Sequence, residues 1–258
     1  MLKVRIIPTL LWKNLGLVKG ISFDSWRRVG TVMPAVKVYN TRQVDELIVV
    51  DISATSESRK PDFEEVREFS SECFVPLTVG GGIRSIEDIT QLLRVGADKV
   101  SINTAAFELP ELVSEAAERF GSQCVVVSID ARKNPDGSYC CMSHSGLHKT
   151  GREPGEWAEE MEQRGAGEIL ITSIDRDGTM KGYDIELIRL ITSRVRIPVI
   201  ASGGAGNYEH LFEALDTGKA AAVAAASIFH FTEQTPLEAK NYLAARGIPI
   251  RNSKVWYR

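Results

Sequence analysis

The sequence predicts an α/β fold of the (β/α)8 TIM barrel class, built from two half-barrel repeats. Short β-branched runs alternate with amphipathic helical stretches along all 258 residues, and no linker of changed composition interrupts them. A glycine-rich turn also recurs about half a chain later in matching surroundings. We expect one domain over residues 1–258, with half-barrels at roughly 1–122 and 123–252 and a tail at 253–258. A doubly wound sheet shares the alternation, but the internal repeat favours the barrel.

Eight β-branched runs account for the expected barrel strands. They lie near residues 4–11, 46–52, 76–80, 98–102, 125–130, 168–174, 197–202 and 220–226. The helical patterns between them include residues 85–95, 110–120, 153–164, 185–195 and 208–217. Gly96, Gly165 and Gly218 each follow a helix at the place of a C-terminal glycine cap. After the fifth strand, the turn residues 134–137 predict a small inserted hairpin.

The two glycine-rich turns stand in the same register within their halves. The first is Val79-Gly80-Gly81-Gly82-Ile83, and the second is Ser202-Gly203-Gly204-Ala205-Gly206. Glu46 precedes the first glycine of its turn by 34 residues, and Glu168 precedes that of its own turn by 35 residues. Backbone N–H groups at a strand-to-helix junction can bind an anion. Two such turns therefore predict a substrate with two phosphates.

The composition excludes several classes of function. The formal net charge is −3, the pI is about 5.9 and no basic stripe stands out, so we expect no nucleic-acid partner. No apolar run approaches the length of a membrane span, and the first residues lack a signal-peptide pattern. Neither the four cysteines nor the four histidines show metal-ligand spacing, so we expect no metal and no cofactor. We expect a soluble, cytoplasmic protein with reduced thiols.

Candidate catalytic residues lie at the carboxyl ends of the predicted strands, where barrel enzymes place their chemistry. Asp130 ends the fifth strand, and Asp177 with Gly178 follows the sixth, so they should meet both glycine turns at one rim. A carboxylate there can act as a general base or hold a polar group of the substrate. The residues alone leave alternatives open, because Asp130 also fits a helix cap or loop ion pair and Asp177-Gly178 also fits a turn.

A second group of charges lies at the opposite ends of the predicted strands. Arg5, Glu46, Lys99 and Glu168 each fall at or near the first residue of a strand. Burying charge is costly unless a network satisfies it, so these four side chains predict a compact salt-bridged plug. A structural closure of the barrel is the simpler interpretation. The alternative is a gate for something that crosses the barrel interior.

Five strings of the sequence together resemble the cyclase subunit of imidazole glycerol phosphate synthase. They are Val79-Gly-Gly-Gly-Ile83, Gly96-Ala-Asp-Lys-Val-Ser-Ile-Asn-Thr-Ala105, Gly165-Ala-Gly-Glu-Ile169, Ser173-Ile-Asp-Arg-Asp-Gly-Thr179 and Ile200-Ala-Ser-Gly-Gly-Ala-Gly206. The resemblance runs from Met1 to about Asn252. It implies a (β/α)8 barrel that docks a glutaminase subunit on its N-terminal face. It further implies that ammonia passes through the barrel to a substrate with two phosphates, giving imidazole glycerol phosphate and an aminoimidazole carboxamide ribotide.

The resemblance also implies roles for individual residues. Arg5, Glu46, Lys99 and Glu168 match the family's ammonia gate, and Thr78 and Asp98 match positions near the partner and the tunnel. Gly82, Asn103 and Thr104 match one phosphate site, whereas Asp177, Gly178, Gly203, Gly204, Ala226 and Ser227 match the other site and its neighbours. Lys19 matches a lysine on the mobile loop after strand one, which we group with the phosphate-binding residues. Asp130 matches one of two catalytic aspartates.

The chain departs from the family at the other catalytic aspartate. That residue ends strand one in a Cys-Leu-Asp-Val-Lys-Asp-Gly pattern, whereas this chain reads Thr9-Leu10-Leu11-Trp12-Lys13-Asn14-Leu15. Leu11 cannot transfer protons, and loss of a positioned acid–base group typically costs about 10²- to 10⁴-fold in rate. We therefore expect divergence toward a branch that, with a glutaminase-like subunit and a separate amidotransferase, converts an acetamido group of a surface sugar into an acetamidino group.

Two alternatives to that divergent function remain. The chain could be a true histidine-biosynthesis cyclase that tolerates Leu11, since its glycine turns are close to the full cyclase pattern. It could instead be a non-catalytic scaffold that only binds and activates the glutaminase. The phosphoribosyl isomerase of the same pathway shares the half-barrel repeat, but it is disfavoured because it has no reason to keep the four charged plug residues.

Overall fold

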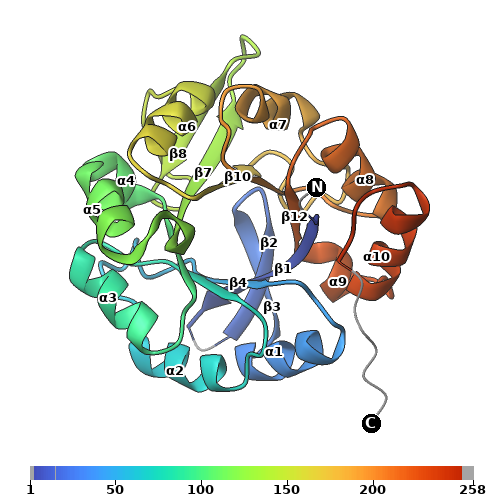
Figure 1. The fold of residues 1–258 in the computed structure, drawn as a ribbon, viewed down its shortest axis with the longest axis horizontal. Helices are drawn as coiled ribbons and strands as arrows, with labels where there is room; N and C mark the ends of the chain where they lie inside the picture. The colour runs from blue at the N-terminus through green and yellow to red at the C-terminus, as the bar shows by residue number, and fades with distance from the viewer. Residues whose placement is uncertain (1–2, 15, 252–258) are drawn as a thin grey trace.

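Eight parallel strands close into a barrel, and helices surround it (Figure 1). The computed structural model describes residues 3–14 and 16–251. The barrel strands, in spatial order, are β1 (Arg5–Lys13), β4 (Leu47–Asp51), β5 (Leu77–Gly80), β6 (Lys99–Ile102), β7 (Val125–Lys133), β10 (Glu168–Ser173), β11 (Val199–Ser202) and β12 (Ala222–Ala225). Each pairs in parallel with the next, and β12 pairs with β1. The (β/α)8 fold class is confirmed, and every predicted strand is found within three residues of its expected bounds.

The helices cover the outside of the barrel. They are α1 (Val32–Thr41), α2 (Phe63–Ser71), α3 (Ile86–Arg94), α4 (Thr104–Glu108), α5 (Glu111–Phe120), α6 (Pro154–Gln163), α7 (Ile185–Thr192), α8 (Tyr208–Asp216), α9 (Ser227–Phe231) and α10 (Pro236–Ala245), with a short 3-10 turn at Ser122–Cys124. Local sequence fixes where several begin. Ser85 and Asp88 form a reciprocal capping box at α3, for example, and Thr235 and Glu238 form one at α10.

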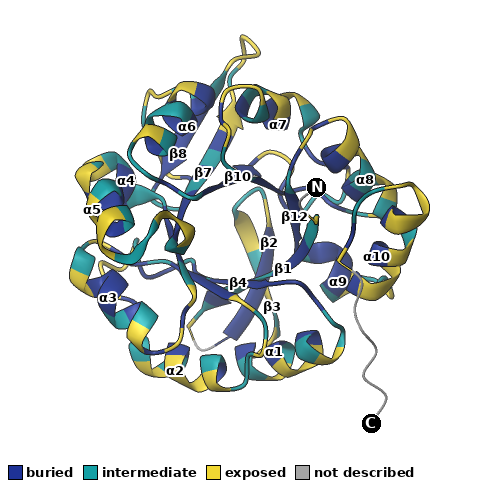
Figure 2. Cartoon of the chain, in the orientation of Figure 1, coloured by how far each residue is buried: buried dark blue, intermediate teal, exposed yellow. Residues whose placement is uncertain are grey.

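The alternation of side chains along the strands creates two apolar layers. Ile6 belongs to the larger layer between strands and helices, whereas Ile7 belongs to a smaller one that also contains Ile48, Val126 and Leu170. In Figure 2 the strands are mostly buried, and the helices expose only their outer faces. Because successive residues of a strand point to opposite faces, the smaller layer is the side-chain filling of the barrel.

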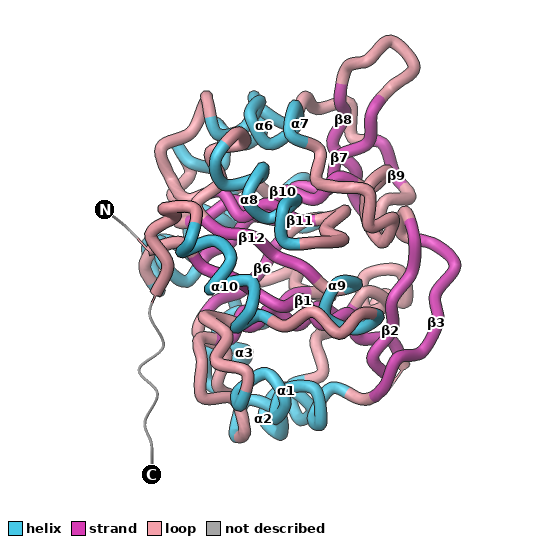
Figure 3. Tube along the Cα trace, turned by 90° about the vertical axis from the view of Figure 1, so that its right-hand side faces the viewer, coloured by secondary structure: helices cyan, strands magenta, loops and turns pink. Residues whose placement is uncertain are grey.

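Two antiparallel hairpins extend from the carboxyl ends of the barrel strands. After β1, the strands β2 (Gly16–Ile21) and β3 (Asp24–Gly30) form the first hairpin. The end of β7 and β8 (Tyr139–Ser143) form the second, and β9 (His148–Lys149) pairs with β8. Both lie at the end of the barrel opposite the N-terminus in Figure 3. The second hairpin was predicted from its turn. The segment that carries Lys19 was expected to be a loop, and that expectation is wrong, because it is a paired strand.

Two further expectations concern glycine caps and the tail. Gly96 and Gly165 have positive φ angles of 114° and 97°, as a helix C-cap requires. Gly218 does not, so its predicted cap conformation is wrong. Its lack of a side chain instead permits close packing, since a Cβ there would lie 2.5 Å from the Ala214 carbonyl oxygen. The predicted tail at 253–258 and the last residue of the second half-barrel lie outside the described residues.

Candidate active site at the carboxyl ends of the strands

A cavity of about 150 Å³ opens among the carboxyl ends of the barrel strands, at what we call the mouth. Its lining includes every residue that the sequence analysis assigned to catalysis or phosphate binding. These are Lys19, Gly82, Asn103, Thr104, Asp130, Asp177, Gly178, Gly203, Gly204, Ala226 and Ser227. Topology brings them together, because the parallel strands of a barrel all end on the same rim.

The two glycine turns are built alike and approach the cavity with bare backbone. Gly81 has a φ of 102°, and a Cβ on it would lie 2.1 Å from the Asp51 carbonyl oxygen. Gly204 has a φ of 112°, and its Cβ would lie 2.2 Å from the Gly182 carbonyl oxygen. Neither position can hold a side chain without moving backbone. Each half-barrel therefore presents peptide groups to the cavity at the same place, as an anion cradle requires.

A short helix follows the next strand in each half, again in equivalent positions. α4 starts after Asn103, whose φ and ψ are −117° and −83°, and α9 starts after Ala226, whose values are −123° and −65°. The Ser227 hydroxyl is buried at this edge of the cavity, and no described residue hydrogen-bonds to it. Because buried hydroxyls are normally paired, this one has capacity for a ligand.

Asp130 is the carboxylate that the structure leaves most reactive. It lies in β7, and one of its oxygens accepts a hydrogen bond from Asn103 Nδ2 at 3.1 Å. Burial, together with the smaller effect of the nearby Asp177 charge, raises the pKa of Asp130 to about 7. A carboxyl group with this pKa exists in both protonation states near neutral pH, which suits a general acid–base catalyst.

The other carboxylate of the pair, Asp177, carries an ion pair. Lys19 Nζ lies 2.7 Å from Asp177 Oδ2, and the Lys19 side chain is almost completely buried. The Ser22 N–H donates to the Asp177 carbonyl oxygen at 2.8 Å, and a Cβ on Gly178 would lie 2.1 Å from the Gly20 carbonyl oxygen. The first hairpin is thus docked against the loop after β10. Lys19 adds the positive charge that an anion would need at this side of the cavity.

Leu11 lies in the cavity lining at the end of β1. The apolar residues Phe23, Trp26 and Ile52 also line the cavity. The end of strand one therefore presents hydrocarbon where the family pattern has its second catalytic carboxylate. Within the described residues that line the cavity, the acidic side chains are Asp51, Asp130 and Asp177.

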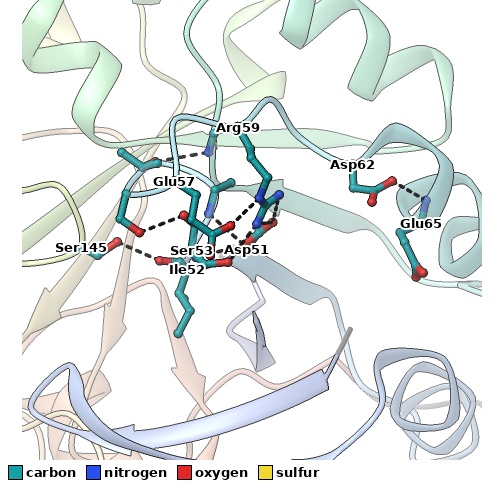
Figure 4. A network of polar contacts seen from close by, with 12 residues as sticks. Asp51, Ile52, Ser53, Glu57, Arg59, Asp62, Glu65 and Ser145 are labelled. Atoms are coloured by element: carbon teal, nitrogen blue, oxygen red, sulfur yellow. Dashed lines mark hydrogen bonds and ion pairs between the residues drawn. The ribbon is translucent and has the colours of Figure 1, made fainter. Parts of the chain in front are cut away.

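Asp51 is the strand-end carboxylate that sequence reasoning missed, and Figure 4 shows why it is not free to react. Its oxygens accept hydrogen bonds from Ser53 N, Ser53 Oγ and Ala54 N at 3.0 Å and from both terminal nitrogens of Arg59 at 3.2 Å. This network folds the loop after β4 over the first glycine turn, where Thr55 Oγ1 lies 3.4 Å from Gly82 N. The signal was available, because Asp51 follows a run of β-branched residues as Asp130 does.

The four predicted plug residues meet at the opposite end of the barrel. Arg5 NH1 lies 2.9 Å from Glu46 and 2.7 Å from Glu168, and Lys99 Nζ lies 3.1 Å from each of the same two carboxylates. Burial alone would lower the pKa of Arg5, but the charges of Glu168 and Glu46 outweigh it and raise the pKa. The plug is a closed ring of two cations and two anions, as the sequence predicted.

The two residues assigned to the partner and tunnel also lie at the plug end. Thr78 is buried in β5 and stands in register with Lys99. Asp98 is exposed just before β6, and its carboxylate accepts a hydrogen bond from Leu77 N at 2.8 Å. Phe74, in the loop that enters β5, is 80% exposed. An exposed aromatic and an oriented carboxylate thus share the amino-terminal end of neighbouring strands.

Other classes of site find little support in the described part of the chain. No group of three or more His, Cys, Asp or Glu side chains within residues 3–14 and 16–251 is arranged to hold a metal ion. Cys140 and Cys141 are buried in β8 as free thiols, and burial raises the pKa of the Cys141 thiol. None of the described helices is both long and apolar enough to cross a membrane.

Comparison with known proteins gives one consistent answer. Residues 5–235 match the model of a family described as histidine biosynthesis protein. The chain is 52% identical to the imidazole glycerol phosphate synthase subunit HisF of Chlorobaculum tepidum, over 97% of this chain and all of that protein. Subunits of the same name from Chlorobium luteolum and Chlorobium limicola are each 51% identical over the same shares.

Proposed function

The chain belongs to the histidine biosynthesis family that contains the imidazole glycerol phosphate synthase HisF subunits, and on that premise we propose that it is an ammonia-using cyclase subunit of a glutamine amidotransferase complex. In this proposal a glutaminase partner releases ammonia at the plug, and the ammonia reacts at the mouth with an acceptor that carries two phosphates. The observation that carries the proposal is the division of the barrel into a charge-neutral plug at one end and a reactive carboxyl group between two glycine cradles at the other.

The interior of the barrel suits the passage of a small neutral molecule. The inner layer consists of Ile7, Ile48, Val126, Leu170 and Ile200 with two alanines. A charged ion would lose its hydration there, whereas neutral ammonia would not carry that penalty. The plug is the polar step on this route, and its four side chains would have to move for ammonia to pass. We therefore assign Arg5, Glu46, Lys99 and Glu168 as the gate.

The glutaminase is expected on the amino-terminal face. The exposed Phe74 and Asp98 are the features that support this docking site, because aromatic residues are enriched at protein interfaces and polar groups form their rims. Thr78 lies directly behind them, in register with Lys99. Docking there would position the source of ammonia over the gate.

The relatives and the residue at position 11 favour different acceptors for the ammonia. The relatives are named for imidazole glycerol phosphate synthesis, which supports the histidine-pathway reaction giving imidazole glycerol phosphate and aminoimidazole carboxamide ribotide. They give no support to the expected divergence toward sugar amidination. Leu11 alone favours that second candidate, in which a separate amidotransferase completes the reaction, because the cavity lacks the second acid–base carboxylate.

A direct assay decides between the two candidates. The purified chain is mixed with the bisphosphate substrate of the HisF reaction, with either ammonium ions or glutamine plus a HisF-compatible glutaminase subunit, and imidazole glycerol phosphate is measured. We expect product from both nitrogen sources and none from Asp130→Asn. Activation of the glutaminase without any product would transfer the proposal to a different acceptor. Neither product nor activation would refute the function.

A further inference from the structure

We propose that Asn103 is a positioning residue whose side chain orients the Asp130 carboxylate, and that it is not an anion ligand through that side chain. The inference deepens the proposed function and rests on it only in taking Asp130 as the acid–base group. It reassigns a residue that the family resemblance groups with a phosphate site.

The amide nitrogen of Asn103 is enclosed by acceptors. Nδ2 lies 3.1 Å from the Ser128 carbonyl oxygen, 3.1 Å from Asp130 Oδ2 and 3.3 Å from the Met142 carbonyl oxygen. An amide nitrogen has two hydrogens, so three acceptors leave it no donor for a phosphate oxygen. The same surroundings fix which atom of the amide faces Asp130, because the amide oxygen could not hydrogen-bond with the two carbonyl oxygens or with the ionised carboxylate.

The remaining polar atoms nearby are also engaged. Asn103 Oδ1 lies 3.4 Å from the Thr104 hydroxyl, and that hydroxyl accepts a hydrogen bond from His144 N at 3.0 Å. An oxygen acceptor repels an anion rather than binding it. Any phosphate held at this edge must therefore be held by backbone N–H groups, and the Asn103 side chain faces the neighbouring strand instead.

The contact spans three elements, which makes it suited to orienting one side chain. Asn103 directly follows β6, Ser128 and Asp130 lie in β7, and Met142 lies in β8, where it stands in register with Asp130. The Asn103 amide thus links the backbone of β7 and of β8 to the Asp130 carboxylate. A carboxylate held by a donor and by two fixed strands has little freedom to turn away from the cavity.

The barrel has two junctions between its halves, β6–β7 and β12–β1, and the second junction lacks both members of this pair. The β6–β7 register, continued by one residue, places Asn103 opposite Ser128, two residues before Asp130. The β12–β1 register, continued in the same way, places Ala226 opposite Thr9, two residues before Leu11. Ala226 has no donor, and Leu11 has no acceptor. The chain therefore has an orienting amide at the junction where there is a carboxylate to orient.

The hydrogen bond has a predictable effect on the acidity of Asp130. A donor aimed at a carboxylate favours the ionised form, so its loss should raise the pKa of Asp130. Hydrogen bonds to charged groups are strong enough that the acid dissociation constant of Asp130 should fall about tenfold or more in Asn103→Leu. Leucine matches the size of asparagine and cannot donate.

The test measures the free protein, so it does not need the enzymatic activity. The Asp130 carboxyl carbon is titrated by ¹³C NMR, and the affinity for inorganic phosphate is measured by calorimetry, in the wild type and in Asn103→Leu. We expect the Asp130 titration to move to higher pH and the phosphate dissociation constant to change by less than about threefold. Loss of phosphate binding with an unmoved Asp130 titration would overturn the inference in favour of a direct ligand.

Two further variants guard the interpretation. Thr150→Val removes a side-chain donor to the Cys141 carbonyl oxygen in the same strand β8, at 2.9 Å, without touching Asp130, and should leave the titration unchanged. Asn103→Ser, whose side chain is about one bond shorter, should repeat the effect if the leucine variant does not fold. If Thr150→Val moves the Asp130 titration as far as Asn103→Leu does, the effect is a general loosening of β8 and the positioning role is refuted. Where turnover is measurable, the acidic limb of its pH profile should move with the NMR titration.

Discussion

The two half-barrels share a scaffold and differ in chemistry. Each has a strand followed by an antiparallel hairpin, then a glycine turn in the left-handed region, then a five-residue helix at the cavity rim. Each also contributes one glutamate to the plug. At the end of the first strand, however, the first half carries Leu11 and the second carries Asp130. The two halves therefore share the glycine turns and the plug glutamates, and they differ in the side chain at the position of Leu11 and Asp130.

This difference indicates which features the fold itself demands. A Cβ on Gly81 or Gly204 would lie 2.1 or 2.2 Å from a backbone carbonyl oxygen, so both halves must keep a glycine at this position. A strand-end side chain that faces the cavity has no such requirement, and either a leucine or an aspartate fits. The predictions below test whether the asymmetry at these two positions controls activity, beginning with the largest effect.

Asp130→Asn should remove the acid–base chemistry of the second half. We expect ammonia-dependent turnover to fall by about 10²- to 10⁴-fold, because the amide cannot exchange a proton with the acceptor. Activation of the glutaminase, which depends on the other end of the barrel, should be unaffected. Steady-state assays with ammonium ions and with glutamine measure both. Unchanged turnover in this variant would mean that Asp130 is not the acid–base group, whereas activation of the glutaminase with no turnover in either protein would favour a scaffold.

Leu11→Asp should make the two halves more alike. Installing a carboxylate at the end of β1 gives the cavity a second acid–base group, and we expect ammonia-dependent turnover to rise at least about tenfold. Leu11→Asn is the matched control, because it is polar and of similar size but cannot transfer protons. Equal turnover in both variants would mean that Leu11 limits the reaction by its shape rather than by its lack of a proton.

The same asymmetry should appear in stability as a function of pH. The pKa of Asp130 is about 7 in the folded chain and about 3.9 for an unfolded aspartate, so the folded state binds more protons between these values. Stability linked to Asp130 is therefore present at low pH and is lost as the pH rises through 7. We therefore compare the unfolding free energy of Asp130→Asn with that of the wild type at two pH values. The difference, variant minus wild type, should be about 2 kcal/mol larger at pH 8 than at pH 5.

Urea denaturation at the two pH values measures this gain, and a second aspartate provides the control. Asp136 lies in the turn of the second hairpin, and hydrogen bonds from Ser138 lower its pKa. It is ionised at both pH values, so Asp136→Asn should show no difference between them. A pH-independent effect of Asp130→Asn would mean that Asp130 is already ionised at pH 5.

The sequence could predict the scaffold better than the site, for physical reasons. The runs of β-branched residues and the glycine-rich turns are local sequence patterns, and they predicted the position of every barrel strand and of both glycine turns. The sequence did not predict the first hairpin, because its turn places Ser22 and Phe23, and no glycine, at positive φ angles of 51° and 63°. The hydrogen bond from the Asn103 amide to Asp130 was not predicted either, because it depends on a register between β6 and β7 that no local pattern reveals.

The smallest expected effect concerns the feature in which the halves are most alike. Glu46 and Glu168 are repeat-related, both are buried, and each pairs with Arg5 and Lys99 at nearly the same distances. Either glutamate-to-glutamine change leaves two cations against one carboxylate, so each should destabilise the chain by about 1–3 kcal/mol. The two losses should agree within about 0.5 kcal/mol, which urea denaturation can resolve when the variants are measured side by side.

Glu72→Gln, in the exposed Lys37–Glu72 pair, should cost at most about 1 kcal/mol and calibrates a surface ion pair. If one glutamate-to-glutamine change lowers the unfolding free energy much more than the other, the two half-barrels contribute unequally to the stability of the plug, although their distances to Arg5 and Lys99 are nearly equal.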